Sequence, residues 1–295
     1  MFPNFFVLGT QKGGTTTLQN LLVSHPEIYL PEQKETKFFA RDREWHKGFE
    51  YYIEKYYSNV TTEKAIGEID PDYMYYAPSL ERMLKTFDEF SNIKLIFILR
   101  NPIERAFSHY LMSLRRGHEQ LKFEDALATE QRRLETADFD EKMHFSYMDR
   151  SHYLPQIERY LQHTSRENIL VLFTEELESD PAATLKKIFH FLNVDEDYLP
   201  VDVNQRHHKA TKPRFLGLRH FLDSSGWLKL SFRAVFPFVS LRQNFKRTLL
   251  SWNETGEYTE KPVIDAETRT QLAKELKPDI QNLAEFCGKN LDHWQ

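Results

Sequence analysis

Three glycines and one lysine stand between an apolar run and a helical pattern near the start of the chain. Residues 5–22 read FFVLGTQKGGTTTLQNLL, and Lys12 lies inside the turn that Gly9 and Gly14 bound. Glycine has no Cβ, so it tolerates positive φ values and lets the backbone approach a ligand closely. The first N–H groups of a helix are unpaired and attract anions. This segment therefore predicts an anion site built from a strand, a glycine turn and a helix N-terminus.

The turn differs from the nucleotide-triphosphate P-loop, G-x-x-x-x-G-K-[ST], at one position. Gly9 and Gly14 have the P-loop separation, but Thr15 stands where the P-loop has its lysine. The lysine contact to the β- and γ-phosphates is thereby lost, and Lys12 approaches the anion from another direction. We therefore expect a nucleotide with a shorter 5′ anion chain. An ordinary glycine-rich turn is the alternative.

A second cationic position follows the clearest buried strand of the sequence, residues 94–99. Arg100 comes directly after this strand, and Ser108 lies one or two turns into the helix that Pro102 is expected to begin. A guanidinium and a hydroxyl so placed can reach one phosphate group. The alternative is that Arg100 pairs with a carboxylate and Ser108 only fills space.

Charged residues also cluster before two phenylalanines, in the segment KETKFF at residues 34–39. Glu35 stands between Lys34 and Lys37, whose positive charges lower the pKa of a neighbouring carboxylate and keep it ionised. A carboxylate within reach of an acceptor hydroxyl can act as a general base. A solvated turn is the alternative interpretation.

Three further charged segments have competing interpretations. The strand expected at residues 65–69 ends before Asp70, which either lines a ligand crevice or forms an Asx-turn. Residues 206–214 are rich in lysine, arginine and histidine, which favours a loop closing over an anion. The paired histidines there have no acidic or thiol partner at ligand spacing, so we predict no metal site. The basic residues 115–118 are interpreted as a solvated face rather than a substrate site.

The elements that must position these groups alternate along the chain. Apolar runs at residues 5–8, 94–99 and 169–173 predict buried strands, and a helical pattern follows each of them. Such alternation predicts an α/β fold of P-loop-like type, with a central parallel sheet between two layers of helices. A final amphipathic helix is expected from residue 265 to residue 283, interrupted near Pro278 because proline breaks a helix interior.

Composition bounds the class of protein. The 295 residues can bury a large core, and 14% aromatic residues argue against disorder. The net charge of −5 gives no global field that recruits nucleic acid, so we predict no nucleic-acid partner. The single cysteine, Cys287, excludes an intrachain disulfide and fits a reducing compartment.

No targeting or membrane segment is visible in the sequence. The first residues lack a basic region followed by an apolar one, and no window approaches the roughly 20 apolar residues of a membrane span. We therefore expect a cytoplasmic protein. The apolar and basic segment 226–241 is interpreted as a buried helix pair, with an acceptor-side segment or a membrane-facing patch as alternatives. The sequence indicates nothing about the oligomeric state.

Four separated segments together resemble the sulfotransferases that use 3′-phosphoadenosine 5′-phosphosulfate (PAPS), in the branch of heparan sulfate and bacterial enzymes. Residues 9–18 are similar to the 5′-phosphosulfate loop, G-x-x-K-x-G-T-[ST]-x-L. Residues 99–110 resemble the 3′-phosphate strand and helix, I-L-R-[DN]-P-x-x-R-x-x-S-x-Y. Residues 34–39 resemble the K-E-x-x-F-F segment that carries the catalytic acid, and residues 212–214 the late loop that closes over the 3′-phosphate and adenine. Their order and separations also match.

The resemblance implies transfer of a sulfuryl group from PAPS to a hydroxyl or amine of a carbohydrate, lipid or small molecule, with adenosine 3′,5′-bisphosphate as product and no metal. It implies one sulfotransferase domain over residues 1–295, with a PAPS-binding core at about 1–215 and a helical portion at about 216–295. Lys37 replaces the histidine of many family members, and it lowers the pKa of Glu35 or stabilises the sulfuryl oxygens. The implied catalytic residues are Glu35 as general base, Lys12 and Lys37, and the implied donor-binding residues are Lys12, Gly13, Gly14, Thr15, Thr16, Thr17, Arg100, Ser108, Lys212 and Arg214.

One departure from the family pattern concerns the acceptor. Where heparan sulfate enzymes carry E-K-T-P-A-Y, this chain has EIDPDY at residues 68–73, so Ile69 replaces a lysine and two aspartates are added. This favours a neutral or cationic acceptor over a highly sulfated polyanion. A P-loop kinase is the closest rival enzyme, but it requires a lysine after Gly14 and an acid at the chief strand end for Mg²⁺. A non-catalytic module that binds nucleotides or polyanions through residues 206–214 is the other alternative.

Overall fold

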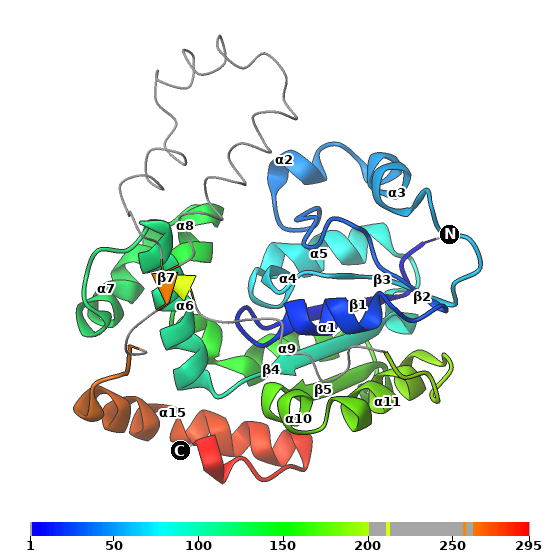
Figure 1. Cartoon of the computed structure of the whole chain (residues 1–295). Helices are drawn as coiled ribbons and strands as arrows, with labels where there is room; N and C mark the ends of the chain where they lie inside the picture. The colour runs from blue at the N-terminus through cyan, green and yellow to red at the C-terminus, as the bar shows by residue number, and fades with distance from the viewer. Residues whose placement is uncertain (1, 201–210, 213–255, 258–261, 295) are drawn as a thin grey trace.

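A sheet of five parallel strands forms the centre of the molecule. The computed structural model describes residues 2–200, 211–212, 256–257 and 262–294. The strand order is β2-β3-β1-β4-β5, so β1 lies in the middle with β3 and β4 beside it (Figure 1). The predicted α/β fold with a central parallel sheet is confirmed. The strands are β1 (Phe5–Gly9), β2 (Ile28–Tyr29), β3 (Ala65–Ile69), β4 (Lys94–Leu99) and β5 (Ile169–Phe173).

Helices separate the strands along the chain, as the alternating pattern predicts. Two short 3₁₀ helices also matter below, η2 (Asp149–Ser151) and η4 (Asp292–Trp294). The α-helices of the described residues are α1 (Thr15–Leu22), α2 (Asp42–Trp45), α3 (Phe49–Tyr57), α4 (Asp72–Tyr75), α5 (Ala77–Thr86), α6 (Pro102–Arg116), α7 (Phe123–Thr136), α8 (Phe139–Phe145), α9 (Tyr153–Leu161), α10 (Thr174–Ser179), α11 (Pro181–Leu192) and α15 (Ala266–Cys287).

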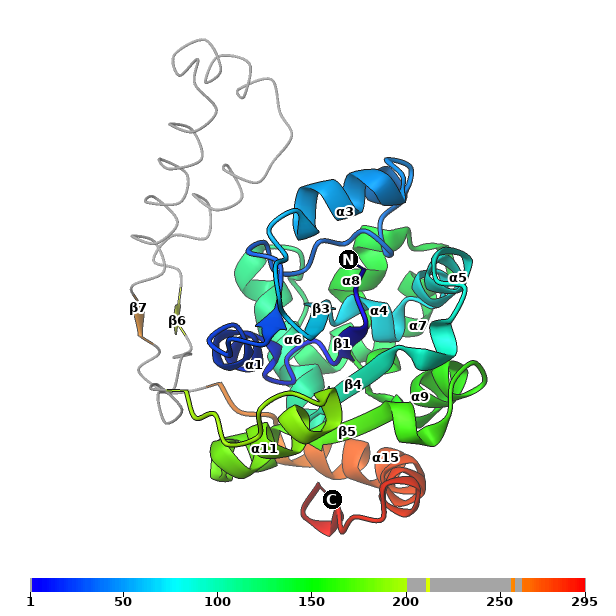
Figure 2. The same ribbon diagram turned by 90° about the vertical axis from the view of Figure 1, so that its right-hand side faces the viewer.

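Different helices cover the two faces of the sheet. In β1, Phe5 and Val7 belong to one hydrophobic cluster and Phe6 and Leu8 to the other, because successive side chains of a strand point to opposite faces. The first cluster includes side chains of α1 and α11, and the second includes those of α5, α6, α9 and α15. Figure 2 shows α1 and α11 on one side of the sheet and α5 and α9 on the other. The protein therefore has three layers.

Local sequence sets both ends of the helix that follows β4. The Asn101 side chain accepts hydrogen bonds from the N–H groups of Ile103 at 3.0 Å and Glu104 at 3.2 Å, so it caps α6. Pro102 occupies the first helical position, where its missing N–H costs nothing and its fixed φ suits the helix. Gly117, with φ of 77°, ends α6 in the left-handed region.

The last long helix departs from its prediction, because α15 continues through Pro278 without interruption. A proline in a helix interior costs roughly 3 kcal/mol. However, the neighbouring Leu276 and Ile280 are buried in the larger hydrophobic cluster, and burial of such a side chain contributes about 1.5–3 kcal/mol. Packing of the apolar face against the body of the protein therefore outweighs the lost hydrogen bond.

Several predictions fall on residues that the structure does not describe. β6 (Thr211–Lys212) pairs antiparallel with β7 (Gly256–Glu257), which describes the backbone of Lys212 and not its side chain. Arg214, the rest of residues 206–214, the segment 226–241 and the boundary near residue 215 lie outside the described residues. Among the helices that the structure describes, none has the length and apolarity needed to cross a bilayer.

Candidate active site

The candidate site lies at the carboxyl ends of β1 and β4, two neighbouring strands whose connections leave toward opposite faces of the sheet. α1 follows β1 and packs on one face, whereas α6 follows β4 and packs on the other. Such a divergence opens the crevice in which open α/β sheets bind ligands. The loop of residues 10–14 leaves β1 and Arg100 directly follows β4, so both predicted anion-binding elements border this crevice.

The loop after β1 has the backbone geometry of an anion cradle. Lys12 has φ of 73° and Gly14 has φ of 91°, both in the left-handed region. A Cβ on Gly13 would lie 2.7 Å from the carbonyl oxygen of Ile98, so only glycine fits between this loop and β4. Gly14 caps α1 without a side chain, and the first-turn N–H groups of residues 15–17 have no acceptor within the helix. These N–H groups are therefore available to an anion.

Arg100 and Lys12 meet at this loop. Arg100 Nη1 donates to the carbonyl oxygen of Lys12 at 3.4 Å. The Thr174 hydroxyl of α10 lies 2.8 Å from the carbonyl oxygen of Gly13 and donates there, which ties the loop to the end of β5. Ser108 is half-buried, two turns along α6. The structure thus brings Lys12 and Arg100 together and places Ser108 on the helix that begins beside Arg100.

Positive charges surround the Lys12 ammonium. Burial lowers the pKa of Lys12 to about 8, and neighbouring cations lower it in the same direction. A concentration of like charges in a partly buried crevice favours an anionic ligand, because the ligand relieves their mutual repulsion. The cations that act on Lys12 are Arg115, Arg116, Arg100 and Lys34.

The interpretation of residues 115–118 as a solvated face describes the two arginines only in part. Arg115 and Arg116 are half-buried and act electrostatically on Lys12. Arg115 follows Ser108 by seven residues, which is two helical turns, so both residues share a face of α6. Arg115 Nε is buried and has no hydrogen-bond acceptor among the described residues. The seven-residue spacing was the sequence signal for this position.

Lys34 connects the anion cradle with Glu35. Its Nζ donates to Thr15 Oγ1 at 3.1 Å and to Thr16 Oγ1 at 2.9 Å, on the first turn of α1. The same ammonium lies 3.2 Å from Glu35 Oε1. The Glu35 side chain is 34% exposed, so its carboxylate remains accessible. Lys34 therefore contacts both the anion cradle and Glu35, the predicted general base.

Glu35 and Lys37 stand in a strained turn that β3 and the residues after it hold in place. Their φ values of 58° and 60° lie in the left-handed region, which residues other than glycine rarely adopt. Between them, Thr36 donates its N–H and its hydroxyl to Glu68 Oε1, at 3.0 Å and 2.6 Å. The N–H of Lys37 donates to Asp70 Oδ2 at 3.1 Å. Fixed acceptors therefore offset the strain of this turn.

The Lys37 ammonium contacts three carboxylates. Its Nζ lies 2.6 Å from Asp72 Oδ2, 2.8 Å from Asp70 Oδ1 and 3.1 Å from Glu35 Oε2. An ammonium has three N–H donors, so these carboxylates account for all of them. Burial acts to lower the pKa of Lys37, but the three carboxylates raise it above its usual range. Lys37 is therefore a fixed positive charge.

Two carboxylates at this lysine have lowered pKa values. Burial acts to raise the pKa of Glu35, but Lys37 and Lys34 outweigh burial and bring it below its usual value. Burial also acts to raise the pKa of Asp72, and Lys37 together with Arg150 lowers it below its usual range. Arg150 Nη1 donates to Asp72 Oδ1 at 2.8 Å. Both carboxylates are consequently ionised at neutral pH.

Of the two roles that the sequence left open for Asp70, the structure shows the Asx-turn, and the buried side chain does not line an open crevice. Asp70 Oδ1 accepts a hydrogen bond from the N–H of Asp72 at 3.1 Å, which is an Asx-turn. Both of its oxygens also contact Lys37 in the site, as described above. The side chain is fully buried, and burial raises its pKa despite the neighbouring ammonium.

The sequence of the cradle, the acidic turn and α6 matches a known family. Residues 2–214 match the family model described as the sulfotransferase domain, which is more than half of the chain. The chain belongs to the sulfotransferase family. The prediction drawn from four separated motifs is thereby confirmed.

Relatives of this sulfotransferase match it to different extents. The membrane-associated sulfotransferase kil1 of Dictyostelium discoideum is 37% identical over 114 residues, which is 38% of this chain and 23% of that protein. Human heparan sulfate glucosamine 3-O-sulfotransferase 5 is 28% identical over 298 residues, 98% of this chain and 73% of that protein. The crystal structure of a sulfotransferase from Alicyclobacillus acidocaldarius aligns with all of this chain and 99% of its own, with a TM-score of 0.72 at 24% identity. That likeness supports the fold.

Two predicted features of this sulfotransferase remain predictions. Within the described part of the chain, no three histidine, cysteine, aspartate or glutamate residues are arranged to hold a metal ion. The side chains of Lys212 and Arg214 lie outside the described residues, so their place relative to the crevice is not described.

Proposed function

We propose that this sulfotransferase moves a sulfuryl group from PAPS to an acceptor hydroxyl or amine and releases adenosine 3′,5′-bisphosphate. The observation that carries the proposal is the chain of contacts from Thr16 through the Lys34 ammonium to Glu35, at 2.9 Å and 3.2 Å. It sets a carboxylate beside an anion cradle, which is the arrangement that transfer from a bound anion to a deprotonated acceptor requires.

The donor fits the cationic crevice at both of its anionic ends. We assign the 5′-phosphosulfate to the N–H groups of residues 12–17 and the Lys12 ammonium. We assign the 3′-phosphate to Arg100 and Ser108, with Arg115 on the same helix face as Ser108. The glycine backbone at residue 13 supports this assignment, because a Cβ there would meet the carbonyl oxygen of Ile98. Lys212 and Arg214 are assigned to closure over the 3′-phosphate on the strength of their sequence motif.

Glu35 is assigned as the general base. It accepts the proton of the acceptor, whose oxygen or nitrogen then forms the new bond to sulfur. The bond between sulfur and the bridging phosphate oxygen breaks, and negative charge develops on that oxygen. The Lys12 ammonium and the N–H groups of the cradle stabilise this charge where it develops. The lowered pKa keeps Glu35 ionised at neutral pH, ready to accept a proton.

Lys37 is assigned to the catalytic centre through its effect on Glu35. Its three N–H donors are directed at carboxylates, so it orients Glu35 and keeps it ionised. This favours the first of the two roles considered for Lys37, in which it lowers the pKa of Glu35, over contact with the sulfuryl oxygens.

The acceptor class we propose is a carbohydrate that carries few negative charges. The human relative is named a heparan sulfate glucosamine 3-O-sulfotransferase, so its acceptor is a glucosamine of heparan sulfate. In this chain Ile69 stands where the heparan sulfate enzymes have lysine, so one positive charge is missing, and Asp72 adds an ionised carboxylate at the Lys37 ammonium beside Glu35. The loss of a cation and the gain of an anion both disfavour a densely sulfated chain. Release of adenosine 3′,5′-bisphosphate in a screen of neutral sugars, amino sugars, lipids and small hydroxyl compounds tests this assignment.

A P-loop kinase is disfavoured by the state of Asp70. A kinase needs a strand-end acid that is free to organise Mg²⁺. Asp70 is fully buried, and its oxygens accept hydrogen bonds from Lys37 and from the N–H of Asp72. We therefore expect no magnesium-dependent turnover of ATP.

Substitution of Glu35 by glutamine tests the proposed base. A neutral amide at this position cannot accept the proton of the acceptor, so transfer of radiolabelled sulfate should fall below about one hundredth of the wild-type rate. Calorimetry should still detect adenosine 3′,5′-bisphosphate with an affinity within a few-fold of the wild type. Glu32→Gln, at an exposed position three residues earlier, is the matched control. Undiminished turnover of Glu35→Gln would exclude Glu35 as the base.

A further inference from the structure

The peptide bond between Arg100 and Asn101 is held at both of its polar groups. The Tyr153 hydroxyl of α9 donates to the carbonyl oxygen of Arg100 at 2.8 Å. The N–H of Asn101 donates to Glu175 Oε1 of α10 at 3.2 Å. Because carbonyl and N–H belong to one rigid plane, these two hydrogen bonds fix the orientation of the peptide that immediately follows the Arg100 Cα.

Trp294 closes a ring of hydrogen bonds around this peptide. Its indole Nε1 donates to Glu175 Oε1 at 3.1 Å, the same oxygen that accepts from Asn101. Its carbonyl oxygen accepts from Asn101 Nδ2 at 3.2 Å. The Trp294 side chain is only 1% exposed and packs edge-on against Phe173, with 5.3 Å between ring centroids. Residues nearly 200 positions apart in the sequence thus meet at the end of β4.

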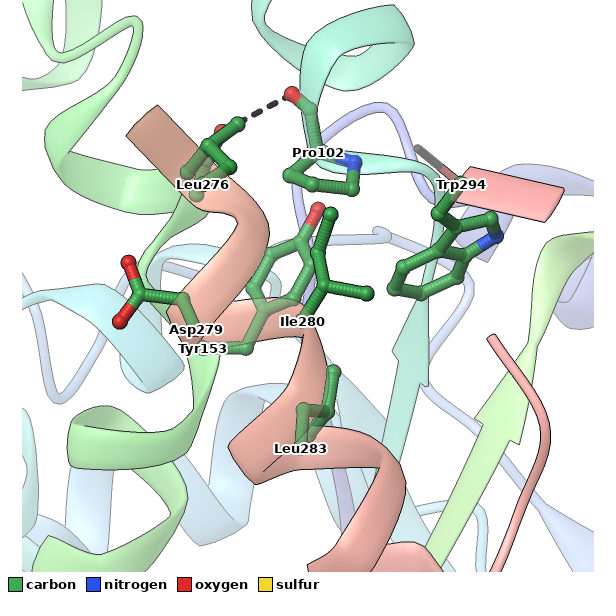
Figure 3. A pocket seen from close by; sticks show the side chains of 8 residues that line it. Pro102, Tyr153, Leu276, Asp279, Ile280, Leu283 and Trp294 are labelled. Atoms are coloured by element: carbon green, nitrogen blue, oxygen red, sulfur yellow. Dashed lines mark hydrogen bonds between the residues drawn. The ribbon is translucent and has the colours of Figure 1, made fainter. Parts of the chain in front are cut away.

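Close packing surrounds the ring on the side of α15. Figure 3 shows the rings of Tyr153 and Trp294 beside Ile280, below Pro102. The cavity between these side chains measures about 10 Å³, which is space for about one water molecule. Ser151 of η2 adds a further contact, because its hydroxyl lies 3.0 Å from the carbonyl oxygen of Pro102 and donates to it. The side chains that hold the turn therefore have little room to move.

We propose that Tyr153, Glu175 and Trp294 are positioning residues that fix Arg100 for the 3′-phosphate of the donor. This inference rests on the proposed function, which assigns Arg100 to that phosphate. The Arg100 guanidinium reaches the carbonyl oxygen of Lys12 from a backbone that these side chains hold. A rotated peptide after Arg100 would redirect the guanidinium away from the crevice. Residues at the far end of the chain thereby set the affinity for one phosphate of the nucleotide.

Tyr153→Phe tests the inference by removing one hydroxyl. Calorimetry should show adenosine 3′,5′-bisphosphate binding about three- to tenfold more weakly, the usual effect of one lost hydrogen bond. Adenosine 5′-monophosphate, which lacks the 3′-phosphate, should bind within twofold of the wild type. The KM for PAPS should rise with the Kd of the bisphosphate, whereas kcat at saturating donor stays within twofold. Tyr29→Phe is the matched control, because Tyr29 donates to a backbone carbonyl at the same 2.8 Å on the edge strand β2.

A double-mutant cycle with Arg100→Ala distinguishes positioning from general weakening of the fold. If Tyr153 acts through Arg100, Tyr153→Phe should change bisphosphate affinity by less than twofold when Arg100 is already alanine. Trp294→Phe keeps a ring and loses the indole N–H, and it should reproduce the selective loss. Two results would overturn the inference. One is that Tyr153→Phe weakens the binding of both nucleotides equally. The other is that Tyr153→Phe weakens bisphosphate binding as much in the Arg100→Ala background as it does in the wild type. Failure of the wild type to bind the bisphosphate at all would instead refute the proposed function.

Discussion

Single side chains divide the crevice into a cationic part and a part with paired charges. Lys12, Arg100 and Arg115 form no ion pair with a carboxylate among the residues that the structure describes. Lys34 and Lys37, in contrast, each contact Glu35. The first group is suited to a multiply charged ligand that arrives from solution. The second group tunes a carboxylate that belongs to the protein.

The proposed contact of Lys12 with the donor predicts that donor binding is sensitive to pH. Its ammonium is charged below the pKa of about 8 and neutral above it, and the bound anion favours the charged form. Affinity for adenosine 3′,5′-bisphosphate should therefore be highest below about pH 8 and fall by up to about tenfold per pH unit above it. Calorimetry between about pH 7 and pH 10 measures this. Lys12→Arg, which stays charged throughout, should lack the decline, and a flat wild-type profile would contradict the assignment.

Arg115 offers a second test at the scale of one residue. Arg115→Ala removes a charge beside Lys12 and should weaken binding of the bisphosphate by about three- to thirtyfold. It should also shift the decline in affinity to higher pH, because the charge of Arg115 is one that lowers the pKa of Lys12. Lys85→Ala, at an exposed position of α5, removes the same charge elsewhere. Equal behaviour of the two variants would show that Arg115 acts only through the net charge.

At the scale of elements, side chains at the end of β3 hold the turn that contains Glu35 in its conformation. Glu68 lies on β3 and Asp70 directly follows it, and both accept hydrogen bonds from the backbone of residues 36–37. The turn has no regular secondary structure of its own. Its left-handed residues therefore keep their conformation through side chains of a neighbouring strand.

Asp70→Asn should weaken the hydrogen bonds that hold this turn and leave the loop after β1 unchanged. An amide nitrogen in place of one oxygen would face an N–H donor of Lys37, which leaves a buried group unpaired. We expect the free energy of unfolding to fall by about 1–3 kcal/mol and kcat to fall at least about tenfold.

Denaturant titration and the sulfate assay measure both effects, and the Kd of the bisphosphate should stay within twofold. Glu44→Gln makes the same chemical change at an ion pair with Lys47, away from the site, and should leave kcat unaltered. A weakened Kd with normal kcat in Asp70→Asn would place Asp70 on the donor side instead.

At the scale of the whole molecule, stability and the site share the layer that α15 completes. Leu276, Ile280 and Leu283 of this helix are buried in the larger hydrophobic cluster. The same cluster contains Ile103 at the start of α6 and Tyr153, which holds the Arg100 peptide. The last helix is therefore part of the support beneath Arg100 and the start of α6.

Leu276→Ala should show how much this layer contributes. The side chain has no exposed surface, and such a truncation in a packed core costs about 2–5 kcal/mol of unfolding free energy. Urea titration followed by circular dichroism measures the change. Leu199→Ala, at a position that is 62% exposed, should stay within about 0.5 kcal/mol of the wild type. An equally small effect at both positions would mean that α15 is peripheral to folding.

The fold was predictable where burial alone decides which residue types a segment contains. β1, β4 and β5 consist almost entirely of apolar residues, since helices cover both faces of this parallel sheet. The glycine turn and Arg100 were predictable because close backbone approach and strand ends have local signatures. The prediction of a helix interruption at Pro278 was wrong, because a proline breaks a helix locally and only tertiary packing opposes this effect.

The rest of the site depends on contacts between distant segments. Arg150 pairs with Asp72 across 78 positions, and no local pattern connects the two residues. Arg115 was interpreted as solvated, since burial of a charged residue at a helix end is decided by what packs over it. The sequence around Trp294 contains no pattern that predicts the hydrogen bond from its indole N–H to Glu175. These partners follow from the assembled layers and not from the spacing of residues.

On the proposed assignments, the two neighbours of β1 in the sheet serve different tasks. Segments 10–17 and 100–116, after β1 and β4, would bind the nucleotide, whereas segments 34–37 and 68–72, the second at the end of β3, hold the proposed base. An exchange of the second pair between related chains would have to keep Arg150 and the first turn of α1, which contact Asp72 and Lys34. The segments assigned to the nucleotide would then pass unchanged into every such descendant.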